Sequence, residues 1–215
     1  MMKIRIKFRK YGTMKFIGHL DVMRYFQKAI RRSEVNIRYS EGFSPHQIMS
    51  FAAPLGVGIT SKGEYVDIEV LDTENSKKMI DRLNAVMSEG FEILEYKLLP
   101  DDAANAMSIV AAADYSLVFR PGYEPEKESP EEWFVNVRKN WEVPALFMKV
   151  SAGSAANIKP ELVLDAYYAS LGEERPQFAF MTEREEVYAD TATAEEAEAG
   201  THKFVTLGDL GQDIE

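Results

Sequence analysis

The amino-acid sequence predicts an α+β protein made of two ferredoxin-like units of the split βαβ kind, the second one degraded, packed together. Residues 3–9 alternate between apolar and basic side chains, as a half-buried strand does. Residues 18–32 repeat apolar side chains at helical spacing. Across residues 1–100 the elements follow the order strand, helix, strand, strand, helix, strand, which is the split βαβ order.

The first unit, residues 1–100, has a clear helix at each helical position. The first helix begins near Gly18 and ends at about Arg32. The second follows the capping residues at 72–76, and Gly90 is expected just beyond its C-terminus. The expected buried stripe of the first helix is Leu20, Met23, Phe26, Ala29 and Ile30. The other expected strands are residues 48–57, 65–70 and 91–99.

In the second unit, residues 110–188, strands and helices alternate again, with one strand less distinct. The motif Ser-Pro-Glu-Glu at 129–132 opens a helix that ends near residue 141, because it supplies an N-cap, a proline at the first helical position and a capping-box glutamate. The other expected elements are a helix over 159–171 and strands over 113–120, 145–150, 177–181 and, less distinctly, 183–188.

Residues 189–215 are expected to form an acidic, flexible tail. The stretch ADTATAEEAEAGTH has no apolar periodicity and consists mainly of Ala, Thr and Glu. Such a composition does not bury enough apolar surface to fold by itself. The apolar positions that follow leave open a last short docked segment, and they are Phe204, Val205, Leu207 and Leu210.

The composition excludes several classes of protein. The chain of 215 residues has no cysteine, which rules out disulfides, thiolate zinc sites, iron–sulfur ligation and a cysteine nucleophile. It has no apolar run long enough for a membrane span. Its first residues alternate instead of forming the apolar block of a signal peptide. We therefore expect a cytoplasmic protein without a membrane partner.

Charge is distributed unevenly along the chain. Residues 1–50 carry 11 Lys or Arg against 3 Asp or Glu, whereas residues 51–215 carry 14 against 32. This asymmetry indicates an anionic partner at the N-terminal part. The basic residues lie on two predicted faces, which are Lys3, Arg5, Lys7 and Arg9 on the first strand and Arg24, Lys28, Arg31 and Arg32 on the first helix.

The segment at residues 36–65 is the most unusual stretch of the chain. It places four glycines and two prolines around one histidine, His46, and two aromatic residues, Tyr39 and Phe43. Glycine and proline at this density fix sharp turns and let the backbone approach a ligand closely. Long structured loops in compact domains are usually functional. The alternative is an ordinary long loop with a packed apolar end.

Two histidines, His19 and His46, are candidates for chemistry because each lies in a polar, turn-forming context. A histidine that titrates near neutral pH can act as general acid or base. Together, or with Tyr39 or Asp21, they could cleave RNA or activate water; alternatively, each caps a helix or bonds a loop carbonyl. His19, Asp21 and His46 are also metal-ligand types. The HxD spacing is very common, however, and no metal or other cofactor is expected.

A second loop, at residues 151–157, is rich in small residues and precedes a helix with Lys159 in its first turn. Free backbone N–H groups at such a position can hold a phosphate or carboxylate. The spacing is not that of a P-loop, and a simple capping loop is the favoured interpretation.

Two stretches of the chain resemble the motifs of a known family. They are FIGHLDVMRYFQKAIRRSEVNIRYSEGFSPHQIMSFAAPLGVGITSKGEYVDIEV at 16–70 and SAGSAANIKPELVLDAYY at 151–168. They resemble the bacterial radical-SAM-linked domain of unknown function, and the likeness spans about residues 3–188. The first motif includes the matches Phe16, His19, Asp21, Arg31, Arg32, Tyr39, Gly42, Phe43, Pro45, His46, Phe51, Pro54, Leu55, Gly58, Glu64 and Tyr65. The departures are Gly18, Ser44 and Gln47, where Ser, Asn and Pro are usual.

The resemblance implies a protein that is fused to, or encoded beside, a radical-SAM protein with a cobalamin-type domain. It also implies an RNA context, because a ribonuclease of the G/E type is encoded nearby in many bacteria. It supplies no reaction. The chain itself has no CxxxCxxC motif and cannot hold a radical-SAM cluster. A radical-SAM protein is therefore the expected partner, RNA is an open one, and neither DNA nor a membrane is expected.

Three functions remain open from the sequence. The first is an accessory module, not catalytic by itself, that binds RNA or a substrate and works with a radical-SAM enzyme. The second is a protein-interaction partner of that enzyme without RNA binding. The third is a metal-independent RNA-processing enzyme that uses His19 and His46. For the first we expect one common binding surface made of Lys3, Arg5, Lys7, Arg9, Asp21, Arg24, Lys28, Arg31, Arg32, Tyr39 and Phe43.

Overall fold

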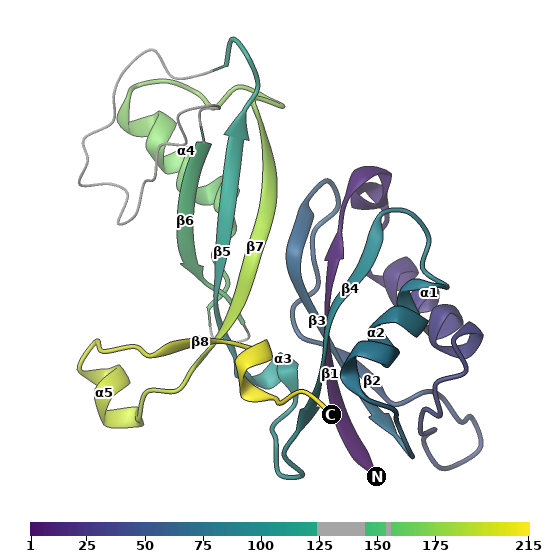
Figure 1. Cartoon of the computed structure of the whole chain (residues 1–215). Coiled ribbons are helices and arrows are strands. Elements are labelled where there is room, and N and C mark those ends of the chain that lie inside the picture. Colours follow the sequence, from purple (N-terminus) through teal and green to yellow (C-terminus); the bar gives the residue numbers. More distant parts are fainter. Residues whose placement is uncertain (124–144, 154–155) are drawn as a thin grey trace.

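The computed structural model describes residues 1–123, 145–153 and 156–215, which form an α+β fold around one mixed, eight-stranded sheet (Figure 1). The sheet path is β4-β1-β3-β7-β5-β6, with β2 paired to β3 and β8 paired to β7. The α+β class predicted from the sequence is confirmed. The strands are β1 Met2–Lys10, β2 Met49–Phe51, β3 Thr60–Val70, β4 Phe91–Leu99, β5 Val110–Phe119, β6 Ala145–Ser151, β7 Phe180–Asp190 and β8 Phe204–Thr206.

The helices of the described residues lie outside the sheet, and none of them is long and apolar enough to cross a membrane. They are α1 His19–Arg32, α2 Ser76–Asn84, α3 Ala106–Ile109, α4 Pro160–Ser170 and α5 Ala194–Glu198, with the 3-10 turns η1 Gly12–Phe16 and η3 Gly208–Leu210. The helix expected over residues 129–141 falls outside the described residues.

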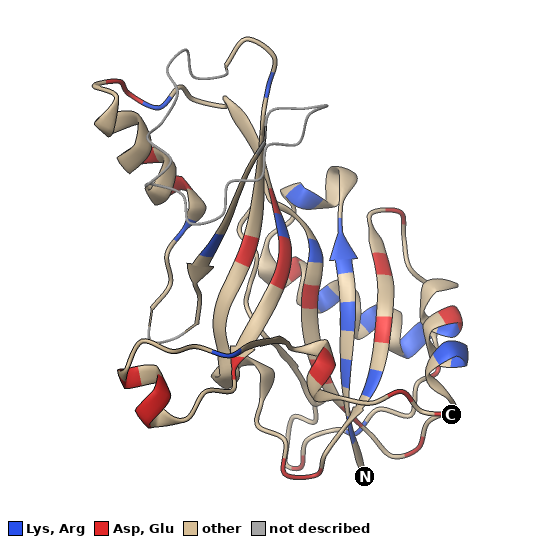
Figure 2. Cartoon of the chain, turned by 60° about the vertical axis from the view of Figure 1, so that its left-hand side comes forward, with Lys and Arg blue, Asp and Glu red and all other residues tan. Residues whose placement is uncertain are grey.

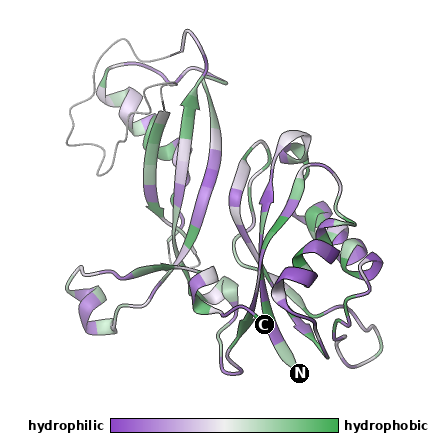
Figure 3. Ribbon diagram, viewed as in Figure 1, coloured by the Kyte–Doolittle hydropathy of each residue, from purple (hydrophilic) through white to green (hydrophobic). Residues whose placement is uncertain are grey.

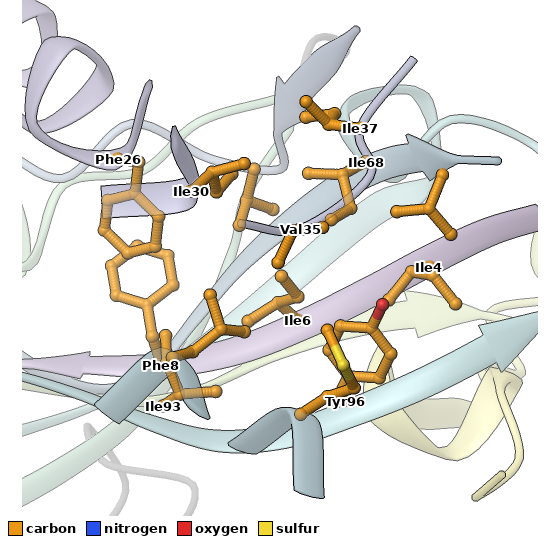
Figure 4. Packing of buried hydrophobic residues seen from close by; sticks show 14 of the residues in the cluster. Ile4, Ile6, Phe8, Phe26, Ile30, Val35, Ile37, Ile68, Ile93 and Tyr96 are labelled. Atoms are coloured by element: carbon orange, nitrogen blue, oxygen red, sulfur yellow. The ribbon is translucent and has the colours of Figure 1, made fainter. Parts of the chain in front are cut away.

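In the first half, α1 and α2 pack on one face of β4, β1 and β3. Alternation along β1 directs Ile4, Ile6 and Phe8 to that face, where each is at most 1 % exposed. Burial of such a side chain contributes about 1.5–3 kcal/mol. The ring of Phe8 packs against Phe26 of α1 with centroids 4.5 Å apart, and Figure 4 shows this pair at one end of the cluster and Tyr96 at the other.

The side of α1 that faces the sheet is apolar, and its other side is polar. Val22, Phe26 and Ile30 follow at intervals of four residues and are all buried. Leu20, which was expected in the same stripe, is 62 % exposed. The reason is helix geometry: Val22 lies on the inner face at the first turn, and Leu20, two positions earlier, is turned about 200° around the axis from Val22 and lies on the solvent side. Figure 3 shows both hydrophobic and hydrophilic positions along this helix.

In the second half, α4 packs on β5, β6 and β7. Tyr115, Leu117 and Phe119 alternate along one face of β5 and are buried, and Leu164 of α4 belongs to the same apolar cluster as Tyr115 and Leu117. β7 is a single long strand, Phe180–Asp190, antiparallel to β5. The sequence had indicated two short segments there, because the charged residues in its middle interrupt the apolar alternation.

The two halves share the sheet through a short parallel contact in which residues 60–61 of β3 pair with residues 183–184 of β7. Next to it, the guanidinium of Arg184 binds both carboxylate oxygens of Glu64, and both side chains are buried. Gly63 is required here, since a Cβ would lie 2.8 Å from a carbonyl oxygen of β7. A buried ion pair and a close backbone approach thus hold the halves together.

Residues 189–215 are not the free tail that their composition indicated. β8 pairs with β7, and the chain then crosses to the first half (Figure 1). There Gln212 bridges to Leu98 of β4, and Ile214 packs against the first apolar cluster. Leu207 is fully buried. A few apolar residues suffice to dock a segment on a sheet that is already formed, although they could not form a core alone.

Two further boundaries differ from those expected. α2 ends at Asn84, and Gly90 lies instead in the turn before β4, with φ +99° and its carbonyl accepting from the Tyr11 N–H at 2.9 Å. The apolar run at 48–57 supplies only the short strand β2, and its glycine-containing remainder is irregular.

Candidate functional site

The outer face of α1 carries exposed cations. Arg24, Lys28 and Arg31 are separated by four and three residues, so they form one stripe that points away from the sheet. Within the described residues, neither Lys28 nor Arg31 has an ion-pair partner. Arg24 meets Asp21 at 3.5 Å, with side chains 69 % and 64 % exposed, a geometry that stabilises little. The positive charges of this stripe are therefore available to an external anion.

Arg32, in the last turn of α1, is exposed but already has interaction partners within the chain. Its Nη2 donates to the Val86 carbonyl at 3.0 Å, and its guanidinium lies 6.0 Å from the Tyr25 ring. A cation at this end of a helix also interacts favourably with the helix dipole. Arg32 thus extends the stripe toward α2 while helping to fix the end of α1.

A tight hairpin over residues 36–48 lies against α1. Tyr39 pairs with Gln47 across the hairpin, and the Gln47 Nε2 donates to the Gln27 carbonyl of α1 at 3.3 Å. The tip turns at Gly42, whose φ of +107° favours glycine. The glycine- and proline-rich segment therefore places its first part directly beside the basic helix.

Aromatic side chains project from this hairpin. Phe43 at the tip is fully exposed, and Tyr39 is 43 % exposed. Exposed rings beside cations are the arrangement that stacks bases and binds phosphates. We name this region the α1–hairpin surface, which consists of Arg24, Lys28, Arg31, Arg32, Tyr39 and Phe43.

The two candidate histidines have separate surroundings. His46 Nδ1 lies 2.8 Å from Ser40 Oγ, which also accepts from the His46 backbone N–H, so His46 braces the hairpin. His19 packs edge-on against Phe51, with centroids 5.2 Å apart. In the described structure no hydrogen bond or ring contact joins His19 to His46. The hairpin meets α1 at Gln27, about 12 Å along the helix axis from His19.

His19, Asp21 and His46 do not form a metal site. No group of three His, Asp or Glu side chains in residues 1–123, 145–153 and 156–215 is arranged to hold a metal ion. The carboxylate of Asp21 faces Arg24 instead. The chemistry available at this surface is therefore that of cations, hydroxyls and aromatic rings.

The basic face of β1 is paired and largely enclosed. Arg5 is 1 % exposed, and its Nε and Nη2 bind both oxygens of Asp67 at 2.8 and 2.9 Å. Lys7 binds Glu186 at 2.6 Å and Glu95 at 3.5 Å. Figure 2 shows the blue bands of β1, which leads from the N-terminus, flanked by red bands on neighbouring strands. These cations are neutralised within the fold.

The outer residues of the same face are also occupied. Lys3 Nζ donates to the carbonyls of Asp101 and Ala103 at 2.6 and 3.0 Å. Arg9 meets Glu92 at 3.4 Å, and its guanidinium lies 4.5 Å from the Tyr11 ring. All four cations of this face thus have partners from their own chain.

The expectation of one common basic surface is wrong. Ile4, Ile6 and Phe8 contact α1 and α2, so Arg5 and Lys7, at alternate positions, point to the opposite face of the sheet. The α1 cations lie on the far side of the helix layer. A strand that buries its apolar face under a helix must turn its charged face away from that helix.

The pairing on β1 changes proton affinities. Burial lowers the pKa of Lys7, but the hydrogen bond and charge of Glu186 outweigh it, and the net pKa is raised above 10.5. Burial and the nearby Glu186 carboxylate raise the pKa of Tyr65, whose hydroxyl donates to Glu186 at 2.7 Å. Burial lowers the pKa of Lys10, whose Nζ donates to a backbone carbonyl. The charged form of Lys7 therefore stabilises the fold, whereas folding disfavours the charged form of Lys10.

Sequence reasoning missed an apolar patch at the start of α1. Phe16 and Leu20 are 65 % and 62 % exposed. Helical spacing alone assigns Leu20 to the core, and only the buried position of Val22 shows otherwise. The signal that could have found the patch is the excess of apolar residues over those that one helix face can bury.

A family model described as an uncharacterized protein conserved in bacteria (DUF2344) matches residues 3–183. The chain belongs to the DUF2344 family. The match contains β1 to β6 and the start of β7, and with them every residue of the α1–hairpin surface. DUF2344 membership confirms that the chain contains a bacterial domain of unknown function. A comparison with curated proteins gives no match.

Proposed function

We propose that this protein is a cytoplasmic accessory module, not catalytic by itself, that binds single-stranded RNA and works with a radical-SAM protein. The RNA contact is made by the α1–hairpin surface. The observation that carries this proposal is the juxtaposition of the unpaired cations Lys28 and Arg31 with the exposed ring of Phe43 on the adjoining hairpin.

The physics of RNA recognition favours such a surface. Cations at intervals of one helical turn neutralise successive phosphates, and an exposed ring stacks a splayed base for about 1–3 kcal/mol. The acidic residues of α1 and the hairpin segment, residues 19–48, are Asp21, Glu34 and Glu41, and the Lys and Arg residues of the same stretch outnumber them. The net charge of the chain is −10. RNA is therefore repelled by most other faces and directed to this one.

We further interpret the first half as a ferredoxin-like unit. The order β1-α1-β2-β3-α2-β4 and the antiparallel pairing of β4 with β1, β1 with β3 and β3 with β2 support this interpretation. RNA would not bind its open sheet face, because the paired β1 cations and the C-terminal segment occupy that face. The helix side is the side that remains.

The pairing with a radical-SAM protein rests on the resemblance of residues 16–70 and 151–168 to the radical-SAM-linked domain. A second candidate function follows from the apolar patch: a protein-interaction partner without RNA binding. Phe16 and Leu20 lie at the start of α1, and the Gly58 N–H donates to the Lys15 carbonyl at 2.7 Å, which holds the exposed Val57 nearby. Apolar side chains are typical of the core of a protein interface, and the aliphatic Leu20 and Val57 cannot stack bases.

RNA processing by His19 and His46 is not part of the proposal. A general acid and a general base must reach the same phosphodiester. The described contacts place His19 against Phe51 and His46 against Ser40, on separate parts of the surface.

The test is a binding titration of a labelled single-stranded RNA of about 20 nucleotides at about 50 and 200 mM salt. The variant carries Arg24→Gln, Lys28→Gln and Arg31→Gln. We expect weaker binding and a log–log salt slope that is shallower by about 2, since each phosphate contact on a single strand contributes about 0.7.

The matched control removes three cations from α2 by Lys77→Gln, Lys78→Gln and Arg82→Gln, two of which pair with Glu74. It should retain the salt slope of the unmodified protein. Equal weakening in both variants, or RNA affinity that does not depend on salt, would refute the RNA contact. Capture of a radical-SAM protein after complete RNA digestion, lost on Leu20→Asp but not on Lys28→Gln, would favour the second candidate.

A further inference from the structure

A cleft between the two halves takes no part in the RNA contact. Its volume is 710 Å³, which is in the range of small-molecule sites. Residues 52–57, which follow β2, form one wall. Residues 157–161, at the start of α4, form the opposite wall. Its buried side chains include Arg184 and Tyr115, which are 3 % and 8 % exposed.

Segments that lie far apart in the sequence meet in this cleft. One wall comes from the stretch at 16–70 and the other from the stretch at 151–168, which are the two stretches that carry the family resemblance. Gly153 allows the second to approach β5, because its φ is +117° and a Cβ would lie 2.1 Å from the Val110 carbonyl oxygen. The backbone is thus specialised to hold this loop close to β5, where it borders the cleft.

The interior of the cleft is apolar and electrically neutral. Leu55, Ile59 and Met107 line it together with small residues of both walls. The charge of Arg184 is already matched, since its guanidinium binds the Glu64 carboxylate and the Ala53 carbonyl. An apolar molecule would therefore meet no unpaired charge inside.

The mouth of the cleft differs from its interior. Lys159 is exposed there and has no ion-pair partner within the described residues. Glu161, the other charged group of the mouth, lies in the first turn of α4, where it interacts with the positive helix end. The cation that stands at the entrance is thus free to bind an anionic group.

We propose that this cleft binds a small amphipathic anion, with its apolar body between residues 52–57 and α4 and its carboxylate, phosphate or sulfonate against Lys159. The site shares no residue with the α1–hairpin surface. The proposal therefore stands or falls independently of RNA binding.

The test compares two fluorescent probes that have the same fused-ring body. 8-Anilinonaphthalene-1-sulfonate carries an anion, and N-phenyl-1-naphthylamine does not. Both should bind the full-length protein saturably at one site, with emission that increases on transfer from water to an apolar environment. Unsaturable or absent binding of both probes would overturn the proposal.

Two exposed positions allow the cleft to be changed without disturbing a core. Val57→Trp fills the entrance and should weaken both probes by about tenfold. Lys159→Gln should weaken the sulfonate probe by about threefold and leave the neutral probe unchanged, as expected for an exposed ion pair. Circular dichroism and thermal unfolding verify that each variant is folded.

Matched controls use similar residues outside the cleft. Leu71→Trp adds the same ring at a position that is 55 % exposed, and Lys77→Gln removes a lysine from α2. Neither should change probe affinity by more than about twofold. Equal effects of Val57→Trp and Leu71→Trp would show binding elsewhere and overturn the site. Equal effects of Lys159→Gln on both probes would overturn the role of Lys159 as an anion partner.

Discussion

Five Lys or Arg residues lie on the strand β1 and four on the helix α1, yet their surroundings differ. On β1, Arg5 binds Asp67, and Lys7 binds Glu186 and Glu95. On α1, the stripe has one weak carboxylate contact among the described residues, at 3.5 Å. A central strand has neighbours about 4.8 Å away on both sides. The outer face of a helix has only its own turns, so its charges stay exposed.

This difference shows why charge counted along a sequence does not locate a binding surface. The carboxylates that neutralise β1 come from β3, β4 and β7, the last of them 179 positions away in the chain. The acidic residues after position 50 thus include the partners of the basic residues before it. What remains for an external anion is the set that lies outside the sheet.

The largest expected effect is that of breaking the buried pair. Arg5→Met removes a side chain that is 1 % exposed and leaves Asp67 without its bidentate partner. We expect a loss of about 3–5 kcal/mol in the free energy of unfolding. Urea unfolding followed by circular dichroism measures it. A loss below about 1 kcal/mol would contradict the burial of this pair.

The double variant Arg5→Met and Asp67→Asn supplies the control for the uncompensated charge. It should recover part of the stability, because the lone carboxylate is then neutral. At temperatures where the variants stay folded, the affinity for RNA should equal that of the unmodified protein. A fall in RNA affinity would mean that Arg5 contributes to RNA binding. The cations of β1 and α1 would then not differ in function.

The contribution of Lys7 to the stability of the fold should depend on pH. Its pKa in the folded protein is raised above 10.5, so the stability that it contributes is fully present below pH 10.5 and is lost as pH rises through the folded value. Lys7→Met should lower the unfolding free energy by about 2 kcal/mol near neutral pH. Glu186 still accepts from Tyr65, which limits the loss.

The measurement is urea unfolding of the unmodified protein and Lys7→Met at about pH 8 and about pH 11. The difference between the two proteins should shrink at the higher pH. Lys77→Met, on the exposed face of α2, is the control and should show no such change. A difference that stays constant with pH would mean that the charge of Lys7 does not stabilise the fold.

Local pattern predicted the elements well where one face of an element alternates between core and solvent. Residues 91–99 were expected as a strand and form β4 with those bounds, and the expected helix at 18–32 is α1. Periodicity predicts these elements because the burial of each side chain depends only on the face of the element that carries it. The segment at 36–65 was identified as unusual from its glycines and prolines.

Contacts between residues that lie far apart in the sequence could not be predicted in the same way. Nothing near Arg5 in the sequence specifies Asp67, and nothing near Leu207 specifies that the chain returns to cover β1. Of the residues expected in one binding surface, those of α1 and the hairpin come from segments that contact each other, whereas the strand residues lie in another layer. A pairing that depends on strand register becomes visible only when the strands are placed.

Phe43, at the tip of the hairpin, allows the RNA contact to be tested without a change in stability. Phe43→Ala removes a fully exposed ring, so the stability should not change. RNA binding should weaken by about tenfold, or ~1.4 kcal/mol, since a stacked base is lost. The control Phe178→Ala removes a ring that is 74 % exposed in the second half and should leave affinity unchanged. Equal affinities of both variants and the unmodified protein would exclude stacking by the hairpin.

The smallest expected effect is that of Asp21→Asn on α1, which is compared with the same type of change, Asp67→Asn, at the buried pair of β1. Asp67→Asn removes a carboxylate from a buried pair, whereas Asp21→Asn removes one from a contact at 3.5 Å between exposed side chains. We expect Asp21→Asn to lower stability by no more than about 0.5 kcal/mol. It should also tighten RNA binding by about twofold, because Arg24 is freed and one negative charge is gone.

Stability and RNA affinity should therefore move in opposite directions on α1, whereas on β1 only stability should move. Thermal unfolding and the RNA titration on the same two variants measure both quantities. If Asp21→Asn weakened RNA binding, Asp21 would have to orient Arg24 for the phosphate instead of competing with it. The exposed pair would then resemble the buried one in function, and exposure alone would not separate the two faces.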